Sequence, residues 1–236
     1  MAGEINTATI FLSLLGGVLP ALFWLWFWLR EDYLHPEPRR MILATFCAGM
    51  ISVVFAFSAE RAVAVLNLEN QLVVLFAWAF IEEVVKYFAV YAIAMHGKFF
   101  DEPIDAMIYM VTGALGFAAI ENFLFILNSQ SIFTSVLTSS MRFIGASLLH
   151  VTASAIIGAA IAMSFYRNKT IKKEYFFVGM ILAVAIHTLF NFLIIQDSGR
   201  NIMPVFIVLW SFAILVLLAF EKAKKINIQK ELIRVQ

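Results

Sequence analysis

The stretch from residue 71 to residue 95 reads QLVVLFAWAFIEEVVKYFAVYAIAM, and it decides the fold class. It is long and apolar enough to cross a bilayer, which takes about 20 residues of helix. Glu82, Glu83 and Lys86 nevertheless interrupt it close to its centre. Each ionisable residue at the centre of a spanning helix costs about 2.5 to 3.5 kcal/mol on insertion scales. Three such residues together indicate a functional site inside a membrane.

The composition of the whole chain agrees with a membrane protein. Of 236 residues, 62% are hydrophobic and only 14% are charged, and the mean hydropathy is +0.89. A soluble domain carries about 25% charged residues. The length predicts one integral membrane domain over residues 1–236, and the net charge of +1 argues against nucleic acid as a partner.

Seven apolar stretches predict an all-α, polytopic membrane helix bundle. Their residue ranges are 8–29, 41–59, 72–95, 104–128, 141–166, 175–196 and 202–220. The residues that suggest chemistry fall within a core of about 72–195.

The distribution of Lys and Arg predicts the orientation of the chain. With the N-terminus outside, cytoplasmic segments hold thirteen Lys and Arg and external loops hold three, and intramembrane Lys86 completes the total of 17. Cytoplasmic loops carry the excess of positive charge in membrane proteins. We therefore expect the N-terminus outside and the C-terminus inside.

Polar side chains from four of the stretches fall in one layer of the predicted bundle. By a rise of about 1.5 Å per residue, Glu82 and Glu83 lie about 15 Å below the external surface. Five further polar residues lie at about that depth or slightly above it: Glu121, Asn122, His150, His187 and Asn191. A shared depth predicts a shared site.

The charges of this layer do not balance with one lysine. Lys86 is four residues after Glu82, the spacing of an internal ion pair. It cannot also neutralise Glu83 and Glu121, so a proton or a charged histidine is expected to compensate. A buried carboxylate of this kind is the typical setting of a general base.

Two chemistries use the same groups. A glutamate can activate water directly while His and Asn side chains steady the oxyanion. Zinc is the alternative, because Glu and His side chains are its usual ligands. The sequence lacks an H-E-x-x-H motif, and this favours the version without metal or other cofactor. The expected ligands of a zinc ion would be Glu82, Glu121, His150 and His187.

The residues just given resemble those of the PrsW family of intramembrane proteases. EEVVK (82–86) matches an E-E-x-x-K motif, and DEPIDAMIYMVTGALGFAAIEN (101–122) is similar to the longer signature that follows it. HTLFN (187–191) matches H-x-x-x-N, and HPEP follows the first stretch as in that family. The resemblance covers roughly residues 30–195. Ala106 departs from the glycine usual after the aspartate.

The resemblance implies a protease that cuts a single-pass membrane protein within the lipid bilayer of a prokaryotic cell membrane, such as an anti-sigma factor at the start of a stress response. It implies that Glu82 activates water, that Glu83 and Lys86 set its charge state, and that the remaining site residues bind water or the oxyanion: His150, His187 and Asn191. Glu121 and Asn122 would support the site. Asp105 would either support it or cap its helix.

Two other functions use similar residues. A proton-coupled transporter or channel also carries intramembrane acids and histidines, although the sequence shows no inverted repeat. A scaffold without catalysis is the other alternative, because the wider superfamily of CaaX prenyl endopeptidases also includes the Aph subunit of gamma-secretase. The doubled glutamate favours the enzyme. The sequence carries no signal for an oligomeric state.

Overall fold

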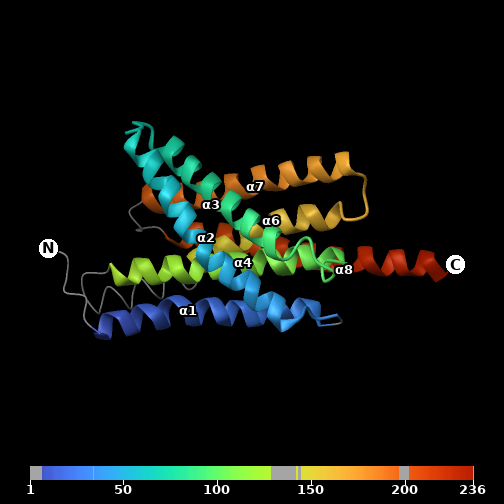
Figure 1. Cartoon of the computed structure of the whole chain (residues 1–236). Coiled ribbons are helices and arrows are strands. Elements are labelled where there is room, and N and C mark those ends of the chain that lie inside the picture. The colour runs from blue at the N-terminus through green and yellow to red at the C-terminus, as the bar shows by residue number, and fades with distance from the viewer. Residues whose placement is uncertain (1–6, 34, 129–141, 143–144, 197–201, 236) are drawn as a thin grey trace.

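A computed structural model describes residues 7–33, 35–128, 142, 145–196 and 202–235, and every regular element in those ranges is a helix. Figure 1 shows their arrangement. The elements are α1 (Thr7–Leu29), the short 3-10 helix η1 (Arg30–Asp32), α2 (Arg39–Val65), α3 (Gln71–Ile93), α4 (Pro103–Leu127), α6 (Ala146–Met163), α7 (Lys169–Gln196) and α8 (Ile202–Val235).

The described helices confirm a polytopic membrane helix bundle. Six of them are long and apolar enough to cross a bilayer: Thr7–Asp32, Arg39–Val65, Pro103–Leu127, Ala146–Met163, Lys169–Ile195 and Met203–Ile226. The remaining long helix, α3, was predicted from the sequence as a seventh span. It has the length of one, but it carries three ionisable residues near its centre, more than any of the six has within its apolar stretch.

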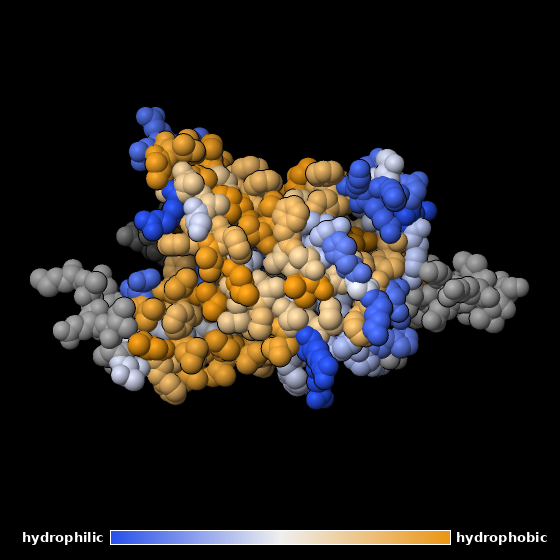
Figure 2. Space-filling view, in the orientation of Figure 1, coloured by the Kyte–Doolittle hydropathy of each residue, from blue (hydrophilic) through white to orange (hydrophobic). Residues whose placement is uncertain are grey.

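The surface is that of a membrane protein. Figure 2 shows an apolar band around the middle of the molecule and hydrophilic side chains gathered toward its two ends. On α3, Phe80, Phe88 and Tyr91 are exposed, whereas Glu82 and Lys86 are buried on the opposite face. The charged face of α3 therefore points into the bundle and its aromatic face points outward.

Helix α4 lies at the centre and packs closely against α1, α2 and α6 (Figure 1). Small residues permit the approach. A Cβ at Gly116 would stand 2.0 Å from the carbonyl oxygen of Phe46 on α2. A Cβ at Gly158 on α6 would stand 2.8 Å from the carbonyl oxygen of Ala106. The packing places Glu121 of α4 in contact with His150 of α6.

The start of α3 is fixed by a side-chain cap. The Asn70 carboxamide oxygen accepts hydrogen bonds from the backbone N–H groups of Leu72 and Val73, at 2.9 and 3.3 Å. Asparagine is among the preferred residues at this position, where it satisfies N–H groups that have no partner within the helix. The cap places Glu82 about 16 Å along α3 from that end.

Candidate active site

The three ionisable residues of α3 belong to a buried polar cluster. Glu82 is 8% exposed, and Glu83 and Lys86 are completely buried. The Lys86 Nζ atom donates to Glu83 Oε1 at 2.6 Å and lies 3.5 Å from Glu82 Oε2. The lysine therefore pairs first with Glu83, three residues away, rather than with Glu82, four residues away.

Glu83 is the anchored carboxylate of the cluster. Besides Lys86, its Oε1 contacts His187 Nδ1 at 2.8 Å, and its Oε2 accepts a hydrogen bond from Ser154 Oγ at 2.9 Å. These partners come from α3, α6 and α7. A carboxylate that is fully buried and held from three helices positions its neighbours.

Both histidines are oriented by a carboxylate on one ring nitrogen. His187 Nδ1 contacts Glu83, and His150 Nε2 contacts Glu121 Oε2 at 2.6 Å. An ionised carboxylate only accepts hydrogen bonds, so these two nitrogens carry the ring protons. In the neutral rings, the lone pairs of His150 Nδ1 and His187 Nε2 are then directed to the interior of the cluster.

Glu82 faces both of these nitrogen atoms, and its Oε2 makes no hydrogen bond. Its Oε2 lies 3.7 Å from His150 Nδ1 and 3.8 Å from His187 Nε2, and it has no hydrogen bond although it is buried. A buried polar atom without a partner is rare and calls for an explanation. Both distances are longer than a hydrogen bond, so Glu82 Oε2 is bonded to neither histidine.

The donor set fits a zinc ion. One atom each of Glu82, His150 and His187 lies within 4.8 Å of the others, and two His with one Glu is a known catalytic zinc set. Carboxylates behind both histidines are also typical of metal sites. Glu121, an expected ligand, instead contacts the outer nitrogen of His150. The Lys86 ammonium lies 2.9 Å from His150 Nδ1, and it competes with a metal for that lone pair.

Arg142 completes the outer layer, and sequence reasoning missed it. Its NH2 atom lies 2.8 Å from Glu121 Oε2, and its Nε donates to Asn122 Oδ1 at 2.6 Å. The Asn122 amide in turn donates to Ser147 Oγ at 3.0 Å. Arg142 thus supplies a second positive charge for the carboxylates, where the sequence led us to expect a proton or a charged histidine.

Two of the selected residues lie apart from this network. Asp105 is 16 residues before Glu121, about 24 Å away along α4. Its Oδ2 accepts from the backbone N–H groups of Asp101 and Glu102, so it caps the helix. Asn191 follows His187 by one turn of α7, is half-buried, and makes no hydrogen bond with another described residue.

Two further residues of the cluster were missed, for different reasons. Ser154 follows His150 by four residues on α6, and this spacing on one helix face is a signal that the sequence does contain. Glu60, near the end of α2, interacts electrostatically with Glu82 and Glu121. Its place at a helix end is typical of a solvated residue, so no sequence signal selects it.

The comparisons with known proteins agree with the resemblance. The chain matches the family described as "PrsW family intramembrane metalloprotease" over residues 37–219. It is 30% identical to "Protease PrsW" of Geobacillus kaustophilus (strain HTA426) over 194 residues, 77% of this chain and 79% of that protein. It is 25% identical over 234 residues to "Protease PrsW" of Bacillus subtilis (strain 168), 94% of this chain and 100% of that protein. No solved structure matches the chain significantly.

Proposed function

The chain belongs to the PrsW family of intramembrane proteases, and we propose that it hydrolyses a peptide bond in or near the transmembrane segment of a membrane-anchored protein. One observation carries the assignment of the site. Glu82 Oε2 is buried, has no hydrogen-bond partner, and faces two carboxylate-held histidines, of which only His150 is engaged on the facing nitrogen, by Lys86. A glutamate that served only in a structural ion pair would have its oxygens occupied by partners. A general base needs an oxygen that is open to accept a proton from water.

Water is the proposed nucleophile, held between Glu82 and His187. Glu82 Oε2 and His187 Nε2 are 3.8 Å apart, so one water can donate a hydrogen bond to each. Its oxygen then attacks the carbonyl carbon, and Glu82 takes the released proton and passes it to the leaving amine. Asn191, with its amide free of other described residues, is the proposed donor to the oxyanion.

The remaining residues position these groups. Glu83 has both oxygens occupied, so it does not act as the base; it holds His187 and Lys86 in place. His150 accepts from Lys86 and contacts Glu121, and it thereby fixes the ammonium beside Glu82.

A metal is implied by the family description, and Glu82, His150 and His187 are the residues that would hold it. When bound there, zinc would lower the pKa of a water ligand to about 7. Lys86 would have to leave His150 Nδ1, because one lone pair does not serve both. We favour hydrolysis without metal because the ammonium already occupies that lone pair.

Metal analysis of the purified, active protein tests this preference. We expect far less than one zinc per chain and unchanged cleavage after dialysis against a chelator. A His187→Ala variant serves as the control, since it removes one of the three ligands and is expected to show the same low metal content. Zinc near one per chain in the wild type, lost from the variant and removed together with activity, would overturn the metal-free proposal.

The distribution of Lys and Arg indicates the orientation of the chain, and the orientation indicates on which side a substrate bond would lie. We propose a cell membrane protein with its N-terminus outside and its C-terminus inside. The cluster then lies about 16 Å below the external surface along α3. A bond at the external end of a single-pass helix, such as that of an anti-sigma factor, is within reach of that depth.

A comparison of protein N-termini tests the function and names the substrates. Cells would express the wild type or Glu82→Gln at matched abundance, at rest and under envelope stress. We expect new N-termini with the wild type alone, near the external ends of single-pass membrane proteins. Identical profiles under both conditions would count against proteolysis and in favour of a scaffold or a transporter.

A further inference from the structure

A second group of carboxylates lies at the opposite end of the bundle from the candidate active site. Asp32 ends η1, Glu37 lies in the connection to α2, and Asp105 is in the first turn of α4. One oxygen of each lies within 4.8 Å of the others. Asp105 is about 24 Å along α4 from Glu121. The group is therefore separate from the residues proposed to hydrolyse the peptide bond.

One oxygen of this group is buried without a partner. Asp105 Oδ2 accepts from two backbone N–H groups, and Glu37 Oε2 accepts from the Tyr109 hydroxyl. Asp32 is only 4% exposed, and its Oδ2 has no hydrogen bond. A buried carboxylate oxygen without a donor is costly, so a partner for Asp32 is expected at this position.

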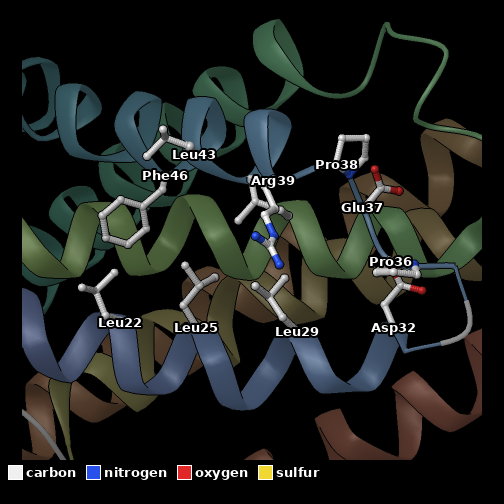
Figure 3. Close-up of a pocket in the computed structure, with 11 residues that line it drawn as sticks. Leu22, Leu25, Leu29, Asp32, Pro36, Glu37, Pro38, Arg39, Leu43 and Phe46 are labelled. Atoms are coloured by element: carbon white, nitrogen blue, oxygen red, sulfur yellow. The ribbon is translucent and has the colours of Figure 1, made fainter.

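No positively charged side chain in the described part of the chain pairs with these three carboxylates. Two cations near the group pair with other carboxylates: His35 contacts Glu102 at 3.0 Å, and Lys224 contacts Glu31 at 2.7 Å. Arg39 lies beside the group in Figure 3 but is exposed and makes no ion pair with a described residue. The negative charge is thus left uncompensated by side chains.

The group borders a pocket. A pocket of about 560 Å³ lies between α1 and α2 and is lined at one end by Asp32 and Glu37 (Figure 3). The rest of its wall is apolar apart from Arg39, and consists of four leucines, Pro36, Pro38, Ile42 and Phe46. Asp32 and Glu37 therefore face open space at that end of the pocket.

We propose that Asp32, Glu37 and Asp105 together bind one hard divalent cation of the Mg²⁺, Mn²⁺ and Ca²⁺ class. Carboxylate oxygens suit these ions rather than softer metals, and waters from the pocket fill the remaining positions. The cation gives Asp32 Oδ2 its missing partner. It also ties the end of α1, the start of α2 and the start of α4 together.

A shared proton is the alternative to a cation. Burial raises the pKa of Glu37, and Glu37 and Asp105 are within hydrogen-bonding reach of each other. A proton between these two carboxyl groups would relieve their repulsion. It would leave Asp32 Oδ2 without a partner, which is why we favour the cation.

Mn²⁺ binding to the full-length protein tests the proposal, because Mn²⁺ is observed directly by electron paramagnetic resonance. The metal-stripped chain in detergent would be titrated with Mn²⁺, and Mg²⁺ and Ca²⁺ would be added as competitors. We expect saturable binding that Asp32→Asn weakens at least about 10-fold, since loss of even a ligand's outer partner costs 10- to 100-fold. Thermal unfolding should move to higher temperature with Mn²⁺ in the wild type and not in Asp32→Asn.

Matched variants distinguish binding at these three carboxylates from binding elsewhere on the protein. Glu31→Gln, one residue away and paired with Lys224, is expected to bind like the wild type. Glu82→Gln should retain the Asp32-dependent binding, so a failure of the proposed protease chemistry leaves this test intact. Glu37→Gln replaces Asp32→Asn if the latter does not fold. Absence of saturable binding in the wild type, or equal binding in the variants of the group, would overturn the cation proposal and leave the shared proton as the explanation.

Discussion

Replacing Glu82 by Gln is expected to lower the rate of cleavage of a defined membrane substrate by about 10²- to 10⁴-fold, the usual loss for a positioned general base. The amide keeps the shape of the side chain but takes no proton from water. The effect should fall on kcat, with KM nearly unchanged, because the substrate still binds. Cleavage in detergent or in vesicles, followed over time with a single-pass substrate found by N-terminal comparison, measures it.

Stability distinguishes this loss from misfolding. Glu82 Oε2 is a buried acceptor without a partner, so its removal should leave the thermal unfolding temperature unchanged or slightly raised. Glu69→Gln is the matched control, an exposed carboxylate in the connection between α2 and α3. Full cleavage by Glu82→Gln would show that Glu82 is not the base. Loss of activity together with a large fall in unfolding temperature would point to a structural role.

Hydropathy predicts most of the helices of the fold, but it does not predict where each helix ends. The expected span of 41–59 corresponds to α2, which continues to Val65, and the span of 175–196 corresponds to α7, which begins at Lys169. A hydropathy pattern detects only the portion of a helix that matches the apolar bilayer core. Helical turns that project beyond it contain ordinary polar residues, and backbone hydrogen bonds rather than apolar composition hold them.

The shared depth of the site residues was predictable from the sequence, but the contacts between their side chains were not. Helix rise places Glu82, His150 and His187 at one depth, and the structure brings these three together. Which ring nitrogen faces which carboxylate depends on helix rotation and on side-chain rotamers, which sequence spacing does not specify. Sequence position does not bring Arg142 against Glu121, 21 residues earlier, and their contact was therefore not predictable from helix periodicity.

The ion-pair partner of Lys86 was likewise not predictable from sequence spacing. The sequence led us to expect Glu82 as the partner, but residues three and four positions away are both neighbours on a helix face. The structure favours Glu83, at 2.6 Å, over Glu82, at 3.5 Å. The difference decides the chemistry, because the glutamate that is not neutralised by the lysine remains available to water.

Replacing Lys86 by Met is therefore expected to destabilise the protein by about 3 to 5 kcal/mol, the usual cost of breaking a buried ion pair by removing one partner. Lys86 and Glu83 are both completely buried, and the ammonium also stands 4.5 Å from the centre of the Phe117 ring. The loss leaves Glu83 ionised in an apolar bundle with only neutral partners. Unfolding in mixed micelles at increasing denaturant concentration measures the change.

A second substitution shows which glutamate the lysine serves. Adding Glu83→Gln to Lys86→Met removes the uncompensated charge, so most of the lost stability should return, because replacing a whole buried ion pair is often nearly neutral. Adding Glu82→Gln instead should restore less, since Glu82 lies farther from the ammonium. The two double-mutant cycles give the coupling energies directly. A coupling of Lys86 to Glu82 as large as its coupling to Glu83 would contradict the pairing in the structure. It would mean that Lys86 neutralises Glu82, the proposed base.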